Sequence, residues 1–298
     1  MISSDINVFS EYTNMITLKE LKNYEKVKNT VIKNSKEFKE IYDYVGTIDA
    51  LIGVASFRDS LNYYTKPELS KSILKRDNKI DNKIEFKDLY HPLIKNPITN
   101  SGDFNKSVLL TGSNASGKST FIKAIAINQL LSQTIYTTCA KNYKSPFFNI
   151  YTSMALKDDI FSSESYYIVE IKSLKRIIDN SNQEIPCLCF VDEILRGTNT
   201  IERIASSCEV LSYLSDSNTI CFAATHDIEL THLLEEKFDN YHFEETITNE
   251  DIKFDYKLHK GRAQTRNAIK LLDFMGYDRD IVNKADNRAK EFLEVGKW

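Results

Sequence analysis

Residues 108–120 read Val-Leu-Leu-Thr-Gly-Ser-Asn-Ala-Ser-Gly-Lys-Ser-Thr, an apolar run followed directly by a glycine-containing loop. The loop has the spacing Gly112-x-x-x-x-Gly117-Lys118-Ser119, which is typical of a phosphate-binding P-loop. Phosphate oxygens need several backbone N–H donors at close range, and glycine leaves such donors accessible. The apolar run predicts a buried strand, and the pattern over residues 121–131 predicts a helix. The alternative is a glycine- and serine-containing turn that matches the P-loop spacing by chance. The order of strand, loop and helix argues against it, because a chance match would not require these flanking elements.

The loop supplies most of the candidate nucleotide-binding residues. Lys118 would reach the β- and γ-phosphates, and Ser119 would ligate Mg²⁺. The helix that begins near Ser119 would direct the positive end of its dipole at the anion. The candidates from this loop are Gly112, Ser116, Gly117, Lys118, Ser119 and Thr120.

A second site element follows the apolar run Ile185-Pro-Cys-Leu-Cys-Phe-Val191, which predicts a parallel strand buried on both faces. The run ends in Asp192-Glu193. A carboxylate at a strand end can hold Mg²⁺, and an adjacent one can orient or deprotonate water, as in a Walker B motif. We therefore assign Asp192 to the metal and Glu193 to catalysis.

The apolar run over residues 219–225 predicts the next buried strand, which delivers His226-Asp227 to the same sheet edge. A histidine there can hydrogen-bond a γ-phosphate or the attacking water. Taken by itself, His226 could equally be a surface histidine at the end of a strand.

Composition sets the class of protein. The 298 residues are 42% hydrophobic and 27% charged, which predicts a globular chain of one large or two modest domains. No apolar run is long enough for a bilayer, so we expect a cytoplasmic protein without a membrane partner. The formal net charge of −3 gives no general argument for nucleic-acid binding, although a local basic patch stays possible.

Cysteine usage points to the same compartment. The five cysteines are an odd number without metal-finger spacing, which favours buried reduced thiols. Cys187 and Cys189 would share one face of a strand, so a metal site there is conceivable.

The remaining elements follow from periodicity. Residues 17–63 predict two helices, the second from about Thr47 to Tyr63, and the polar residues 65–82 predict a connector. This divides the chain into a helical N-terminal region with connector, 1–83, and a nucleotide domain, 84–298. Further strands are expected at 84–90, 147–151 and 254–258, and further helices at 166–180, 265–275 and 280–292. Ser165 stands where a helix cap is expected.

The motifs together resemble those of the MutS family, the ABC-related ATPases of DNA mismatch repair. Residues 111–120 resemble that family's TGPNxGGKST. Asp192-Glu-Ile-Leu-Arg-Gly-Thr-Asn-Thr200 resembles its DEIGRGTST, and Ala224-Thr-His-Asp-Ile-Glu-Leu-Thr231 resembles its ATHxxELT. Asp158-Asp-Ile-x-Ser-x-x-Ser-x-x-x-Val-Glu170 resembles its signature segment, with Ser163-Glu164 around the position where the family has glycine. Weaker similarity extends from about Tyr42 to Phe292.

The resemblance implies a P-loop NTPase of the ABC type, with a mostly parallel α/β sheet flanked by helices behind a short helical N-terminal region. It implies that Asn114 contacts the phosphates, that Ser165 reaches the nucleotide of a partner subunit in a homodimer, and that His226 is a switch histidine. Ile98 would lie near the adenine.

We therefore predict an Mg²⁺-dependent ATPase, the motor module of a MutS-like mismatch repair or DNA-structure-sensing protein. It would meet DNA through a longer chain or a partner, and associate with the nucleoid when on DNA. The alternative is a nucleotide-dependent switch for protein assembly without direct DNA recognition. A more distant alternative, an ABC-type repair ATPase of the SMC kind, would have an LSGG-like motif shortly before the Walker B strand, and none stands there.

Overall fold

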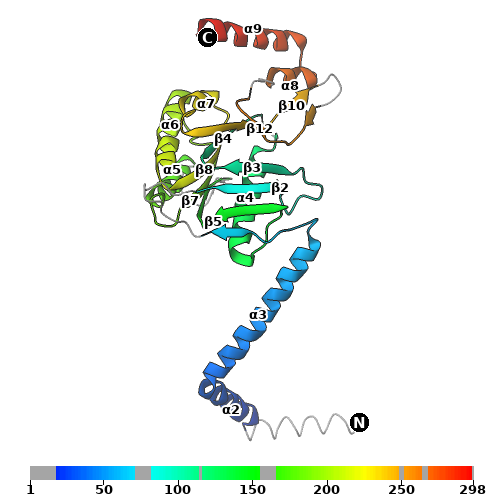
Figure 1. Ribbon diagram of the computed structural model, residues 1–298, viewed down its shortest axis with the longest axis vertical. Coiled ribbons are helices and arrows are strands. Elements are labelled where there is room, and N and C mark those ends of the chain that lie inside the picture. Colours follow the sequence, from blue (N-terminus) through cyan, green and yellow to red (C-terminus); the bar gives the residue numbers. More distant parts are fainter. Residues whose placement is uncertain are drawn as a thin grey trace. The chain divides into compact units, whose positions relative to one another are not determined.

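A computed structural model describes residues 18–70, 82–113, 116–154, 166–247, 252–263 and 268–296. Its contacts divide the chain into two units, Met1–Ser60 and Leu61–Trp298 (Figure 1). This division falls before the 83/84 boundary expected from the sequence, because a short strand within the expected connector pairs with the second unit. Among the described residues, no helix has both the length and the apolar content needed to cross a bilayer.

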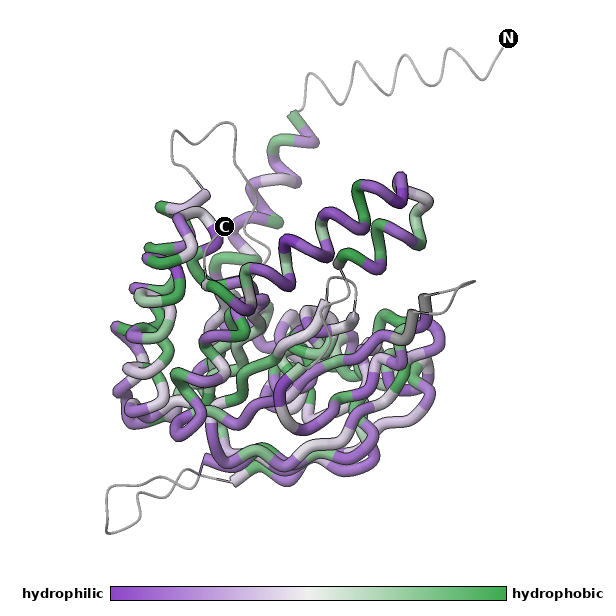
Figure 2. Tube along the Cα trace, turned by 90° about the horizontal axis from the view of Figure 1, so that it is seen from above, coloured by the Kyte–Doolittle hydropathy of each residue, from purple (hydrophilic) through white to green (hydrophobic). Residues whose placement is uncertain are grey.

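The first unit consists of helices α2, Lys19–Lys33, and α3, Ser35–Ser60. The predicted helix boundary near Thr47 is wrong, since the break lies at Asn34, whose side-chain amide donates to Thr30 O at 2.9 Å. Thr47 continues the helix instead, with its hydroxyl donating to Asp43 O at 2.7 Å. None of the side chains of α2 or α3 is buried. Figure 2 shows hydrophilic and hydrophobic residues interleaved along the described helices.

The second unit is built on a six-stranded sheet with the order β12-β9-β4-β8-β7-β6. All neighbours from β9 to β6 pair in parallel, and only β12 is antiparallel. All residues of β4 and β8 are buried, as are all but the last of β7, which explains their continuous apolar sequences. The prediction of an α/β fold is confirmed. The strands are β4 (Ser107–Thr111), β6 (Asn149–Ser153), β7 (Cys187–Asp192), β8 (Thr219–Ala224), β9 (Phe238–His242) and β12 (His259–Lys260).

A smaller sheet has the order β1-β5-β2-β3. The inner strand β2 is antiparallel to both of its neighbours, β5 and β3, whereas the edge strand β1 runs parallel to β5. The strand β5 was not expected from the sequence, and β6 begins two residues later than predicted, because Phe147 and Phe148 form an irregular link between the two strands. The strands are β1 (Glu68–Ser70), β2 (Ile84–Leu89), β3 (Asn100–Phe104) and β5 (Asn142–Pro146).

Two hydrophobic clusters cover the two faces of the large sheet. The first joins the small sheet and α4 (Lys118–Ile135) to β4, β7 and β8, and includes Phe104 and Phe222, whose ring centroids are 5.2 Å apart. The second joins the opposite face to α5 (Tyr166–Asp179), α6 (Thr200–Asp216) and α7 (Ile228–Leu233). Burial of apolar area on both faces holds the sheet and its strand ends in place.

The C-terminal part departs from one expectation. The strand predicted at 254–258 is wrong: β11 (Ile252–Phe254) pairs with β10 (Glu245–Ile247), and residues 255–258 form an irregular connection to β12. The cause is a local turn, in which the Asp255 carboxylate accepts from Lys257 N at 2.9 Å and Tyr256 has a φ of 53°. Helices α8 (Ala268–Phe274) and α9 (Arg279–Val295) lie within three residues of their predicted bounds.

Candidate active site

The P-loop joins the end of β4 to the start of α4, as the sequence predicted. Gly112 has a φ of 138° and Gly117 a φ of 110°, both in the region that favours glycine. A Cβ at Gly112 would lie 2.8 Å from Phe243 O, so the loop also needs glycine for close backbone approach. Asn114 lies outside the described residues.

Lys118 is folded back onto its own loop. Its ammonium group donates to Gly112 O at 2.7 Å and Ser113 O at 2.8 Å, and the residue is only 5% exposed. Burial lowers the pKa of Lys118, against the opposing effect of nearby carboxylates, first that of Asp192. The hydroxyl of Ser116 is buried close by, without a hydrogen-bond partner among the described residues. An anion in this loop would therefore meet a cation and a hydroxyl group that needs a partner.

The carboxylates follow β7 as predicted. Asp192 is the last residue of β7 and pairs in register with Ala224 at the end of β8. The next residue, Glu193, continues this pairing, since its N–H donates to Ala224 O at 2.9 Å. Its φ of 57° is unusual for a residue with a side chain. The strand ends thus bring Asp192 and Glu193 beside the segment that carries His226.

Glu193 has two partners. Its Oε1 lies 3.1 Å from His226 Nε2, and its Oε2 accepts from Arg196 at 2.5 Å. Burial lowers the pKa of His226, as does the nearby charge of Lys118, while Glu193 acts in the opposite direction. A neutral His226 facing a carboxylate must donate through Nε2–H, so this contact selects the Nε2-protonated tautomer. His226 and Glu193, predicted separately from two strand ends, are therefore brought together.

Two adjoining cavities surround the P-loop. One, of about 300 Å³, is lined by P-loop residues, Ser119, Glu193 and Tyr256. The other, of about 570 Å³, is lined largely by apolar and aromatic side chains, with His91 and Asn96 among the polar ones. Gly117, Thr120 and Tyr256 line both cavities. A ligand with an anionic end and a flat apolar end would fit this pair of cavities.

Ile98 lines the larger cavity, although the residue is 47% exposed. The sequence reasoning missed Phe254 and Tyr256, which approach this cavity from a segment more than 150 positions away. Their ring centroids are 5.9 Å apart. A Cβ at Gly117 would lie 3.1 Å from the Tyr256 ring, so this ring packs directly on the P-loop. The only sequence signal was the family resemblance of the segment around Tyr256, which did not indicate the position of its ring.

The residues that could hold Mg²⁺ are Ser119, in the first turn of α4, and Asp192. Among the described residues no group of three or more His, Cys, Asp or Glu side chains could hold a metal. Mg²⁺ commonly keeps several waters and takes only one or two protein ligands. In the described part of the chain, Cys187 and Cys189 belong to no such group. All five cysteines are free thiols, four of them buried and Cys208 partly exposed.

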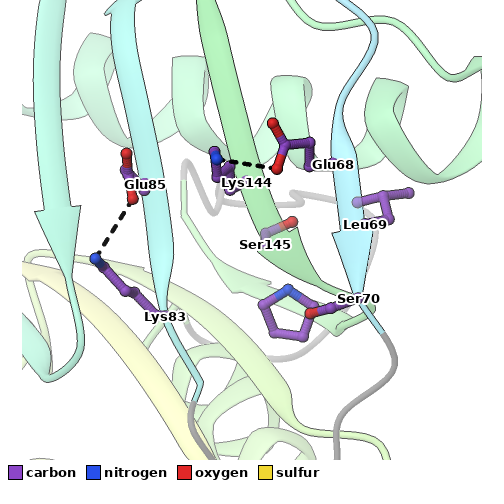
Figure 3. Close-up of a pocket in the computed structure, with 8 residues that line it drawn as sticks. Glu68, Leu69, Ser70, Lys83, Glu85, Lys144 and Ser145 are labelled. Carbon is purple, nitrogen blue, oxygen red and sulfur yellow. Dashed lines mark ion pairs between the residues drawn. The ribbon is translucent and has the colours of Figure 1, made fainter.

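A separate cavity of about 400 Å³ lies beside the small sheet (Figure 3). Its two lysines already face carboxylates, with Lys144 2.9 Å from Glu68 and Lys83 3.4 Å from Glu85. Ser165, which was predicted to reach the nucleotide of a partner subunit, lies outside the described residues. We therefore place the candidate site at the P-loop.

Comparison with known proteins adds a family relationship. Residues 108–293 match the family model for MutS domain V. Similar proteins include the "DNA mismatch repair protein MutS" of Acetivibrio thermocellus, 29% identical over 282 residues that cover 90% of this chain and 31% of the relative. The "DNA mismatch repair protein MSH3" of Debaryomyces hansenii is 27% identical over 278 residues, 88% of this chain and 27% of the relative. The human "MutS protein homolog 4" is 30% identical over 259 residues, 78% of this chain and 26% of the relative. The chain spans less than a third of the length of these relatives.

Proposed function

This chain belongs to the MutS family, and from that membership we propose that it binds and hydrolyses ATP as the motor domain of a DNA mismatch repair or DNA-structure-sensing protein. One observation carries the proposal: a polar cavity at the P-loop adjoins an apolar cavity and is lined by Glu193, which contacts His226. An ABC-type arrangement of the ATPase is part of the proposal.

The polar cavity would receive the phosphates. Lys118 would exchange its two carbonyl partners for phosphate oxygens, and the unpartnered Ser116 hydroxyl would donate to another. Asn114 would add a further contact. The adenine would enter the larger cavity between Ile98 and the ring of Tyr256, where aromatic stacking favours a flat base.

Ser119 and Asp192 would hold Mg²⁺, which when bound would neutralise phosphate charge. Glu193 would orient the attacking water and take its proton. His226, kept neutral by burial and by Lys118, would hydrogen-bond the γ-phosphate or the same water. Glu193 also contacts Arg196 and His226, one through each oxygen, and each oxygen has a second lone pair that could accept from the water.

Dimerisation and DNA binding complete the proposal. Each nucleotide site would be completed by Ser165 of a second copy, which would give a homodimer with two equivalent sites. DNA would be met by a longer chain or by a partner. We propose residues 84–298 as the nucleotide domain. The preceding connector would contribute strand β1, which pairs with β5 of that domain.

The second candidate is a nucleotide-dependent assembly switch without direct DNA recognition. The formal net charge of −3 favours it, since a nucleic-acid binder usually has a basic surplus or face. ATP turnover that rises with added duplex or mismatched DNA would favour the repair motor. Turnover indifferent to every DNA structure would favour the switch.

The proposal is tested by nucleotide binding and turnover of residues 1–298 with Mg²⁺. Lys118→Ala should lose nucleotide binding and turnover together, because it removes the cation that faces the phosphates. Lys106→Ala is a matched control, as Lys106 is exposed at the opposite end of β4. A wild-type chain that binds no ATP, or a Lys118→Ala variant that binds it normally, would refute the proposal.

A further inference from the structure

The turn that follows β7 has an unusual backbone. Glu193 has a φ of 57° and Leu195 a φ of 53°, so two residues with side chains lie in the left-handed region within three positions. Each such residue is disfavoured by roughly 1–2 kcal/mol, and it persists only where the surrounding structure holds it. The contacts that hold this turn therefore determine where the Glu193 carboxylate lies.

One contact comes from Glu170 on α5. Its Oε1 accepts from the Leu195 N–H at 2.5 Å, and the residue is only 2% exposed. The pKa of Glu170 is raised, chiefly by burial and also by the charge of Glu193, against the opposing effect of the Leu195 and Arg196 amides. Its other oxygen is buried without a partner among the described residues. A carboxyl group kept in such surroundings makes a strong acceptor for backbone amides when ionised.

A second contact joins the same two segments. Gly197 ends the turn, and a Cβ there would lie 2.9 Å from Tyr167 Cβ and 3.0 Å from a Tyr167 ring carbon. Tyr167 precedes Glu170 by one turn of helix α5. The first part of α5 therefore contacts the segment after β7 at two points, Leu195 and Gly197. The buried side chains of Ile194 and Leu195 extend this contact into the cluster that contains Leu174 of α5.

We propose that Glu170 is a positioning residue: by holding the backbone at Leu195 it keeps Glu193 within reach of His226 and of the nucleotide site. Glu170 is not among the described residues that line the two cavities at the P-loop, so it would act through the turn. The inference rests on the proposed catalytic role of Glu193. It predicts that loss of Glu170 separates hydrolysis from nucleotide binding.

Kinetics provides the first test. Glu170→Ala should lower kcat about tenfold or more, as expected for a barrier raised by about 1.4 kcal/mol, and leave ATP affinity within about twofold. Glu170→Gln keeps one accepting oxygen and should recover most of kcat. Ser173→Ala is the matched control, because it removes another hydrogen bond of α5, the 3.2 Å bond to Thr152 O, without touching the turn. Equal loss of affinity and kcat, or no loss of kcat, would overturn the proposal.

A second test needs no turnover. Since Glu193 raises the pKa of His226 against burial and Lys118, moving Glu193 away should lower that pKa further. NMR titration of the nucleotide-free protein would measure it, with the resonance assigned by loss of signal in His226→Gln among the five histidines. Glu170→Ala should lower the His226 pKa, and Ser173→Ala should not.

The two tests separate this inference from the proposed function. A wild-type chain without ATP turnover would refute the proposed function, while the titration would still decide whether Glu170 positions Glu193. An unchanged His226 pKa in a folded Glu170→Ala protein would overturn the inference even if the wild type is an active ATPase.

Discussion

Glu193 is the residue on which binding and chemistry are expected to separate. It lines the smaller cavity at the P-loop without belonging to the loop, and its two oxygens contact Arg196 and His226. Glu193→Gln should keep ATP affinity, because the loop and Lys118 are untouched, and lose turnover by about 10²-fold or more, as is typical for removal of a general base. Filter binding and phosphate release would measure the two quantities. Glu209→Gln, on the exposed face of α6, should change neither, and a parallel fall in affinity would remove Glu193 from its catalytic role.

His226 gives the site its expected pH dependence. Burial and Lys118 hold the pKa of His226 below its usual value of 6.5, so the ring is neutral at pH 7 and gains a proton only in more acidic solution. Turnover should therefore be flat from pH 7 to 8 and fall as the pH drops through the lowered His226 pKa. His226→Gln cannot take up a proton and should remove this acid limb. An acid limb of the same shape in His226→Gln would assign it to other groups.

At the level of elements, α6 is tied to the turn after β8 by Arg203. This guanidinium donates to both oxygens of Asp227, at 2.9 and 2.6 Å, and both side chains are partly buried. Arg203→Ala would leave the Asp227 carboxylate unpaired and should lower stability by about 1–3 kcal/mol. That loss corresponds to a fall in Tm of about 2–4 °C per kcal/mol for a domain of this size.

A contrasting ion pair on α9 serves as the control for this thermal unfolding experiment. Lys284 and Asp280 lie one helical turn apart and both are well exposed. Lys284→Ala should change Tm little, because exposed pairs contribute about 0–1 kcal/mol. Equal effects of the two variants would show that burial does not strengthen the Arg203 contact.

The elements also show where sequence reasoning succeeds. The strands β4, β7 and β8 were predictable because burial on both faces requires continuous apolar runs, and their carboxyl ends then brought the P-loop, Glu193 and His226 together. The break at Asn34 and the turn at Tyr256 were not, because each depends on local backbone geometry that the apolar pattern does not record. The contact between Glu170 and Leu195 joins helix α5 to the turn after β7, 25 positions further along the chain. No rule of sequence spacing predicts such a contact.

At the scale of the whole molecule, charge limits direct contact with DNA. The chain has 39 Lys and Arg against 42 Asp and Glu, so only a local patch could neutralise phosphates. Residues 1–298 alone should bind duplex or mismatched DNA weakly, and the affinity should fall steeply with salt because counterion release supplies most of the binding free energy. Fluorescence anisotropy between about 50 and 200 mM salt would measure this. Tight, mismatch-selective binding by this chain alone would contradict the proposal that DNA is met by a longer chain or partner.

The hydrogen bonds of Lys118 to Gly112 and Ser113 have a consequence for how the loop is filled. The two carbonyl oxygens are intramolecular competitors: they accept from the ammonium N–H groups that an incoming triphosphate would need. Under the proposed function, nucleotide entry would be a displacement reaction, in which two internal hydrogen bonds are exchanged for bonds to the ligand. Only the difference between the two sets contributes to affinity, so the resting loop is itself a determinant of how tightly this protein holds its ligand.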